Sequence, residues 1–540
     1  MRVNIVNASM VAALMLWAWP ARAIPRSPEK DQLRAMARMP KMDLQFGLSF
    51  DPLQGFAFLT PVLDVPAEIE KLKTALKGEV YDAEKYLRLG RLFQETRDRP
   101  KSLVSFQAAE KLYRKQLDLQ PGSAEVLCQL GLALAAQGKD SEAETKFRDA
   151  VEIAPDSAKA WIMLGRHWQG VAFDLLCGTG MTRNRVPFNR AVVNLVARPP
   201  VREKVDQAER WIAEAGRCFD RAVALTNLQA RAYAERAMHG SFSNAVSNAI
   251  AIMRGDESAV RKIEASCFSE EALLDFQRAA RLDPRNCSMI AAAALFEAST
   301  ILLQGDKTSF SDVLRGEFWN WLPEEAQNRI RQAVTHLEQL TDTSETELAA
   351  SSCEALGFLQ ELVFKDSTAA EKSLRRTVEL DPARERAWDL LISIVGRRHR
   401  YPELVEICSD RLKEKENVRN HLLLAKAYEK VDDLEAAERE VRLAIAQDGA
   451  NFFANLSLAN LLLKRQGGAE AWGVRDALRK AEQNMGAGAG RQNIIDLAIS
   501  QSIFYALTGD VETARRILKG ILNVSRDVPE VKQLLLLVGY

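Results

Sequence analysis

The sequence has no surplus of charge of either sign. Its 540 residues include 73 lysines and arginines and 73 aspartates and glutamates, so the formal net charge is zero. A general nucleic-acid binder needs an excess of basic side chains to neutralise phosphates, so this balance argues against a nucleic-acid partner. The hydrophobic fraction of 47% argues equally against a disordered chain.

Histidine and cysteine are too few and too scattered to indicate a site of chemistry. The five histidines lack the spacing of metal ligands, and the seven cysteines form no Cys-x-x-Cys pair. We find no Walker pattern, no Gly-x-Ser-x-Gly and no His-Glu-x-x-His. The sequence therefore predicts no catalytic residue, no cofactor and no metal. An enzyme with its site in the irregular middle, residues 170–330, stays open as an alternative.

The cysteines divide into two groups by their surroundings. Four fall within helical patterns, where a free thiol behaves as a small buried hydrophobe; these are Cys128, Cys218, Cys353 and Cys408. The other three lie nearer to expected loops and can pair in an oxidising compartment; these are Cys177, Cys267 and Cys287. The odd count leaves at least one thiol free.

Long apolar runs are also missing. Met10–Trp19 is an unbroken apolar run of ten residues, whereas a spanning helix needs about 20. The run is followed by Pro20 and by Ala21-Arg22-Ala23, which fits a signal-peptide core and its cleavage site. We predict a signal peptide over residues 1–23, cleavage after Ala23, no transmembrane anchor and a periplasmic or secreted protein. A cytoplasmic location is the alternative if residues 1–23 are retained.

Proline is scarce where the apolar periodicity is strong. Of the 18 prolines, six fall between Pro25 and Pro66. We expect residues 24–80 to form a Pro-rich N-terminal arm, with a short helix that places Ile69, Leu72 and Leu76 on one face. The alternating character near Gln45–Phe50 allows a β-strand there.

An internal period dominates the rest of the chain. Pro121 and Pro155 are 34 residues apart, and so are Gly131 and Gly165. Between the two prolines lie a set of large apolar residues, one glycine and small residues, namely Leu127, Leu130, Gly131, Leu134, Ala143, Phe147 and Ala150. This segment resembles the tetratricopeptide repeat. Gly131 and Ala143 are small where the two helices of the unit approach each other, and Pro155 ends the second helix.

The resemblance extends, with degenerate units, over residues 81–540. It implies an all-α fold, a right-handed α-α superhelix of roughly ten helix pairs with insertions. We assign residues 81–286 to a tetratricopeptide array with two insertions and residues 287–540 to its C-terminal half, ended by a capping helix over Pro529–Tyr540. Because such repeats are overwhelmingly non-catalytic, the resemblance implies a binding protein.

Irregular segments and groove positions supply the candidate binding residues. The first insertion, Leu175–Arg202, carries five arginines and no acidic residue, and its candidates are Arg183, Arg185 and Arg190. The second, Met238–Cys267, predicts an extra helix hairpin. The third carries Trp319 and Trp321, which serve either as binding anchors or as a plug for an irregular repeat. The candidate basic groove residues are Arg166, Arg386, Arg419 and Lys426.

The groove positions follow from the repeat spacing. They come one residue after the first large position of each regular unit and again four residues later. They are Cys128 and Leu132, Ile162 and Arg166, Asp389 and Ser393, Leu422 and Lys426, and Leu456 and Asn460. The sequence thus predicts a non-catalytic scaffold of the secreted or periplasmic compartment that binds a protein or extended peptide in a concave groove, with an acidic partner as one option. A cytoplasmic assembly or regulatory scaffold is the alternative, and the oligomeric state is left open.

Overall fold

The described part of the chain forms two compact units. The computed structural model describes residues 36–37, 50–51, 55–56, 65–78, 82–95, 98–177, 201–225, 229–254, 256, 268–303, 318–465, 470–485, 491–524 and 528–538. The middle unit comprises Gly47–Trp388, and the C-terminal unit comprises Asp389–Tyr540 together with Met1–Phe46. Each unit is described by itself below.

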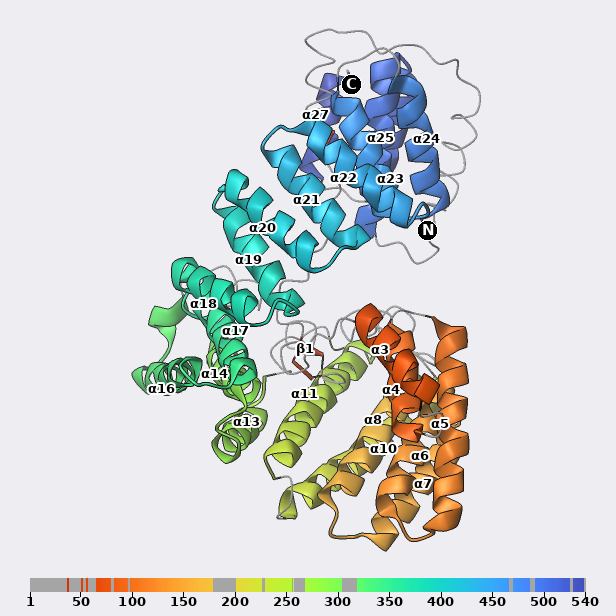
Figure 1. The fold of residues 1–540 in the computed structure, drawn as a ribbon, viewed down its shortest axis with the longest axis vertical. Coiled ribbons are helices and arrows are strands. Elements are labelled where there is room, and N and C mark those ends of the chain that lie inside the picture. Colours follow the sequence, from red (N-terminus) through yellow and green to blue (C-terminus); the bar gives the residue numbers. More distant parts are fainter. Residues whose placement is uncertain are drawn as a thin grey trace. The chain divides into compact units, whose positions relative to one another are not determined.

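The middle unit is built almost wholly from helices (Figure 1). They are α3 (Val65–Gly78), α4 (Ala83–Glu95), α5 (Arg99–Leu119), α6 (Ala124–Gln137), α7 (Asp140–Ile153), α8 (Ala158–Cys177), α10 (Arg202–Ala224), α11 (Gln229–Met253), α13 (Glu270–Leu282), α14 (Cys287–Leu303), α16 (Glu324–Thr341), α17 (Thr346–Leu362) and α18 (Ser367–Leu380). A 3-10 turn, η1, covers Phe318–Trp321. Two short antiparallel strands, β1 (Phe50–Asp51) and β2 (Gly55–Phe56), pair Phe50 with Phe56.

The C-terminal unit continues the same pattern. Helix α19 (Glu385–Arg397) crosses from one unit into the other. It is followed by α20 (Tyr401–Glu414), α21 (Val418–Lys430), α22 (Leu434–Gln447), α23 (Phe452–Lys464), α24 (Glu470–Gln483), α25 (Arg491–Thr508), α26 (Val511–Val524) and α27 (Pro529–Leu537).

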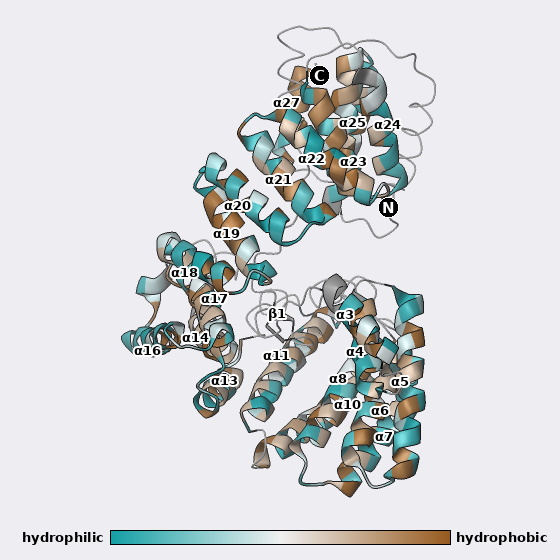
Figure 2. Cartoon of the chain, viewed as in Figure 1, coloured by the Kyte–Doolittle hydropathy of each residue, from teal (hydrophilic) through white to brown (hydrophobic). Residues whose placement is uncertain are grey.

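Consecutive helices pack as pairs, and neighbouring pairs stack. The pairs in direct contact include α4 with α5, α6 with α7, α8 with α10, α11 with α13, α17 with α18, α21 with α22, α23 with α24 and α25 with α26. Most helices carry both apolar and polar residues along their length, as Figure 2 shows. One helix pair cannot bury its apolar stripe alone, so stacking supplies the core. The predicted all-α fold class is confirmed.

Close contact between a glycine and a large side chain sets the distance within a pair. A Cβ added at Gly131 of α6 would lie 2.8 Å from the Phe147 ring of α7. The same relation recurs between Gly90 of α4 and Phe106 of α5, where the Cβ would lie 2.6 Å from the ring. It recurs again between Gly165 and Phe219 and between Gly357 and Leu374. The glycines that recur at the repeat spacing therefore lie where the two helices of a pair come closest. Only a residue without a side chain lets the helices approach to this distance.

The ends of the repeats follow local chemistry. The Ser123 side chain caps α6 by accepting a hydrogen bond from the backbone N–H of Val126. Gly138 ends the same helix with a φ of 88°, in the left-handed region. A tryptophan ring closes the junction between two repeats, because Trp161 Nε1 donates to the Pro155 carbonyl oxygen at 2.9 Å. Trp388 makes the same bond to Pro382, also at 2.9 Å.

Two sequence-based expectations meet the structure with different results. The short helix of the N-terminal arm is present as α3, which buries Ile69, Leu72 and Leu76. In the stretch 238–267, where an extra helix hairpin is expected, α11 runs as one helix up to Met253; residues 257–267 lie outside the described residues, so the hairpin stays a prediction. The small apolar residues of this stretch, such as Ala245 and Ala249, are buried along the face of α11 that packs with α8 and α10.

Helix α14 shows how the irregular middle is filled. Every residue from Met289 to Thr300 is buried, so this helix has no solvent-facing side over three turns. It packs against α13, α16 and α17. Among the described residues, no helix combines the length and the apolar character needed to cross a membrane.

Candidate interaction surfaces

The groove positions predicted from the repeat differ in exposure. The first member of each predicted pair is buried, so it does not line an open groove; these residues are Cys128, Ile162, Asp389, Leu422 and Leu456. The second member is half-buried at Leu132, Ser393 and Lys426, exposed at Arg166 and buried at Asn460 of α23. The accessible part of a first helix therefore begins about one turn later than expected.

Arg166 of α8 is held by a carboxylate of the next first helix. Its Nε lies 2.7 Å from Glu235 Oε2, and its second nitrogen donates to Glu235 Oε1. Arg231 Nε lies 3.7 Å from the same oxygen. The Glu235 side chain is 6% exposed, whereas those of Arg166 and Arg231 are 46% and 47% exposed. We call these three residues the Glu235 cluster; it carries one net positive charge that faces water.

A neutral hydrogen bond extends this contact by one turn. His239 Nδ1 lies 2.9 Å from Gln169 Oε1. Burial lowers the pKa of His239 to about 4, so the ring is neutral at pH 7. Because an amide oxygen only accepts, Nδ1 carries the proton. The ring also lies 5.1 Å from that of Phe219, which fixes its place in the core.

A third tie joins α6 and α8, the first helices of two consecutive repeats. Lys159 Nζ lies 2.7 and 2.8 Å from the two carboxylate oxygens of Glu125. These two residues occupy the same position in consecutive repeats, and both are exposed enough for water to weaken the pair. Together the three contacts show that side chains on the first helices link neighbouring repeats within the chain itself.

In the C-terminal unit, too, two arginines contact one carboxylate, that of Asp389. Arg419 donates to Asp389 Oδ2 at 2.8 Å, and Arg411 donates to Asp389 Oδ1. Arg411 is 3% exposed and Arg419 is 37% exposed. Arg386, in the middle unit, and Lys426 are both half-buried. The predicted role of Arg166, Arg386, Arg419 and Lys426 in binding a partner stays a prediction.

The candidate residues of the first insertion, Arg183, Arg185 and Arg190, lie outside the described residues.

The two tryptophans of the third insertion have different surroundings. Trp319 packs against the core of the middle unit, with its ring 4.4 Å from that of Phe364 and 5.2 Å from the Arg331 guanidinium. Trp321, two residues later, is 62% exposed. Trp319 therefore fills space left by the irregular repeat, and Trp321 is the member that a partner can reach.

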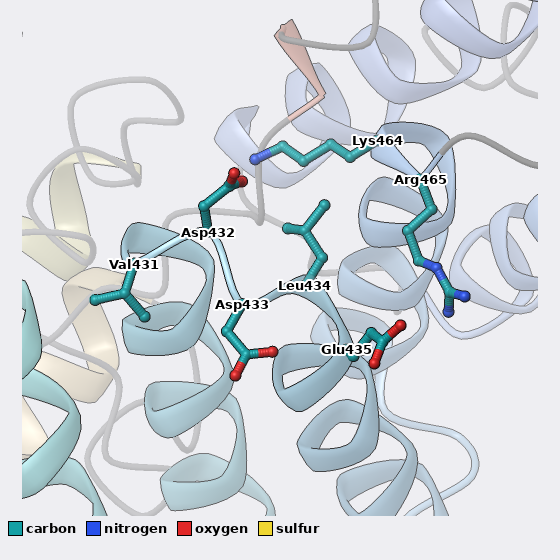
Figure 3. A pocket seen from close by; sticks show the side chains of 7 residues that line it. All are labelled: Val431, Asp432, Asp433, Leu434, Glu435, Lys464 and Arg465. Carbon is teal, nitrogen blue, oxygen red and sulfur yellow. The ribbon is translucent and has the colours of Figure 1, made fainter.

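Two shallow recesses were not found by sequence reasoning. The first has a volume of about 730 Å³ and lies at the turn between α21 and α22 (Figure 3). It is lined by Val431, Asp432, Asp433, Leu434, Glu435, Lys464 and Arg465. Lys464 and Arg465 also pair with Glu429 and Glu438, so the recess keeps a surplus of carboxylates. The run of acidic residues at 432–435 was the available signal.

The second recess has a volume of about 440 Å³ and lies on the polar face of α16. Asn328, Arg331, Gln332, Thr335, His336 and Gln339 line it, spaced so that they share one side of the helix. His336 Nε2 lies 2.6 Å from the Pro284 carbonyl oxygen, which links this face to the end of α13.

The cysteines described with their side chains are thiols that are neither exposed nor bonded to each other. Cys128, Cys218, Cys287, Cys353 and Cys408 are free and buried. Burial raises the pKa of Cys128, Cys218 and Cys408 to about 12. Cys287, one of the three cysteines that can pair, is thus a free thiol, and the side chains of the other two, Cys177 and Cys267, lie outside the described residues. No group of three or more metal-ligating side chains occurs among the described residues.

Comparison with known proteins identifies one helix pair. Residues 124–157 match the family described as Tetratricopeptide repeat. The chain contains a tetratricopeptide repeat. It consists of α6 and α7, the pair in which Gly131 meets Phe147. No curated protein matches the chain.

Several solved structures resemble the chain at low identity. Yeast Tom70 is 16% identical, over 88% of this chain and 94% of that chain, with a TM-score of 0.35. Cut9–Hcn1, a hetero-tetramer of the APC/C, is 14% identical over 84% and 89%, with a TM-score of 0.31. The TPR domain of P58(IPK) is 14% identical over 81% and 99%, with a TM-score of 0.17. Likeness at this level says nothing about what this chain binds.

Proposed function

We propose that this chain is a non-catalytic scaffold that binds an extended, acidic segment of a partner protein on the first-helix face of the middle unit. The Glu235 cluster carries the proposal. Its carboxylate is buried and already neutralised by one arginine, so the second guanidinium leaves a positive charge at a half-exposed surface. A carboxylate of a partner can share these guanidinium groups through charge-assisted hydrogen bonds.

The same arrangement recurs elsewhere, which supports a general affinity for acidic segments. Asp389 lies between Arg411 and Arg419, and Glu438 lies between Arg442 and Arg465. In each case one carboxylate with little exposure faces two arginines, at least one of them substantially exposed. Around Asp389 an acidic peptide therefore meets local positive charge on a chain whose net charge is zero, whereas the carboxylates of the recess beside Arg465 offset the charge at Glu438.

Fluorescence anisotropy with labelled peptides of opposite charge tests the proposal. A 12-residue Glu/Ser peptide is expected to bind the full chain, with affinity that falls as salt rises, whereas a Lys/Ser peptide is not. The variant Arg231→Gln is expected to weaken binding of the acidic peptide at least fivefold. The matched control is Arg217→Gln, because Arg217 on α10 is exposed and pairs only locally with Glu214. Equal binding by both variants would overturn the assignment to the Glu235 cluster.

We also propose that the protein acts outside the cytoplasm. The support is the apolar run Met10–Trp19 followed by Ala21-Arg22-Ala23. N-terminal sequencing of the protein from its native host tests this, and a mature chain that begins at Ile24 is the expected result. A chain that still begins at Met1 would favour a cytoplasmic scaffold instead.

A further inference from the structure

One short piece of the N-terminal arm is buried in the C-terminal unit. Ala37 is 1% exposed and belongs to the same buried cluster as Phe452, Leu456 and Leu463 of α23. Met36 is partly buried and packs against this cluster. The arm and helices α23–α27 are far apart in sequence, so nothing in the repeat pattern requires them to meet.

The helix α23, which shares this cluster, has a closed groove face. We call Leu456, Asn460 and Leu463 the α23 row; in the repeat they correspond to Cys128, Leu132 and Ala135, the α6 row. All three residues of the α23 row are buried, whereas Leu132 and Ala135 of α6 are half-buried. From Ala454 to Leu463 only Leu458 is not fully buried, so α23 has no side left for solvent.

The neighbouring first helix is closed in the same way. Every residue of α25 from Ser500 to Leu507 is buried, which covers two full turns. A solenoid repeat contacts only its neighbours and leaves its groove face for a ligand. Helices α24 and α26 pack as the second helices of their pairs, with α23 and α25, and α27 packs against α26 at the end of the stack. Ala37 comes from outside the stack and is buried in the same cluster as residues of α23 and α25, so the arm segment is one of the elements that cover these helices.

We propose that the arm segment containing Met36 and Ala37 is an intramolecular ligand of the C-terminal unit, which occupies the groove in front of α23 until a partner segment displaces it. The site takes a small side chain next to a large, flexible apolar one, because the alanine is enclosed and the methionine lies at its edge. The partner that displaces it carries the same small-large pair. This site is independent of the Glu235 cluster, which belongs to the middle unit.

The expected consequence is a site that is hidden in the intact chain. A ligand that competes with a tethered segment sees an affinity reduced by the fraction of chains in which the site is open. A synthetic peptide of residues 28–46 is therefore expected to bind weakly to the wild-type chain. In the full-chain variant Ala37→Glu, the tethered segment carries a charge that the enclosed position cannot accept. This variant is expected to bind the labelled peptide at least tenfold more tightly than the wild-type chain.

Two controls make the result decisive. A peptide of residues 28–46 that itself carries Ala37→Glu is expected to bind neither chain. Hydrogen exchange is expected to rise at α23 and α25 of the variant chain and to stay unchanged at α6 and α7. If the Ala37→Glu chain loses hydrogen-exchange protection throughout the C-terminal unit, the milder Ala37→Gly chain is tested in its place. A smaller gain in affinity for the labelled peptide is then expected. Equal binding of the peptide to wild-type and variant chains, or no binding to either variant, would overturn the proposal.

Discussion

The α6 row and the α23 row occupy the same repeat position but differ in exposure. Leu132 and Ala135 are half-buried, whereas Asn460 and Leu463 are buried. The pair contact behind each row is similar, because Gly131 of α6 and Ala459 of α23 are both small and face the second helix. The contact within a helix pair therefore does not determine how exposed the groove face is. That exposure depends on the side chains of the face itself and on the residues that pack against them.

The largest expected effect comes from placing a charge in each row. Leu456→Asp puts a carboxylate at a fully buried position and is expected to destabilise the C-terminal unit by about 4 kcal/mol. Leu132→Asp, at the half-buried position of α6, is expected to cost below about 1 kcal/mol. Calorimetric unfolding of both full-chain variants measures this. Similar losses in the two variants would contradict the contrast between the rows.

A second comparison contrasts two ties between first helices of the middle unit. Glu235→Gln leaves Arg166 and Arg231 facing each other over a buried amide, and we expect a loss of about 2 kcal/mol. That is less than for a fully buried pair, because both arginines can turn to water. Glu125→Gln, in the exposed pair with Lys159, is expected to change stability by about 0–1 kcal/mol. Urea denaturation with the same probe for both variants provides the measurement.

The same substitution at two glycines tests the pair contact itself. Gly131→Ala places a Cβ 2.8 Å from the Phe147 ring, and the resulting overpacking is expected to cost about 1 kcal/mol. Gly240→Ala in α11, whose Cβ meets nothing within 4 Å, is expected to stabilise by about 0.5–1 kcal/mol. Opposite shifts of the melting temperature are the expected result. If both variants were stabilised, Gly131 would not be set by its contact with Phe147.

The repeat spacing predicted much of the fold because it reports local contacts. Gly131 opposite Phe147, and Trp161 after Pro155, are fixed by residues within one period. The exposure of the groove row could not be predicted in this way, because Ala37 lies outside the repeat and its burial depends on a long-range contact. For the same reason the sequence indicated Arg166 as a candidate but gave no sign of Glu235, which lies in the next repeat beyond an insertion of irregular length.

The last comparison is a difference in pH response between the two units. In the C-terminal unit, burial raises the pKa of Glu482 to about 7, so the folded state binds a proton that the unfolded state has released. Its stability contribution is therefore present below about pH 4.5 and is lost as pH rises towards 7. In the middle unit, burial lowers the pKa of His239 to about 4, so its contribution is present above about pH 6.5 and is lost as pH falls towards 4.

Between pH 4.5 and 6.5 the two groups thus act in opposite directions on the two units. Unfolding of the Glu482→Gln and His239→Gln variants across this range, compared with the wild-type chain, isolates each contribution. Glu482→Gln is expected to raise the melting temperature of the C-terminal unit at pH 8 and to leave it unchanged at pH 4. His239→Gln is expected to reduce the loss of stability of the middle unit on acidification. A Glu482→Gln chain that keeps the wild-type dependence on pH would show that this carboxyl is not protonated near neutral pH.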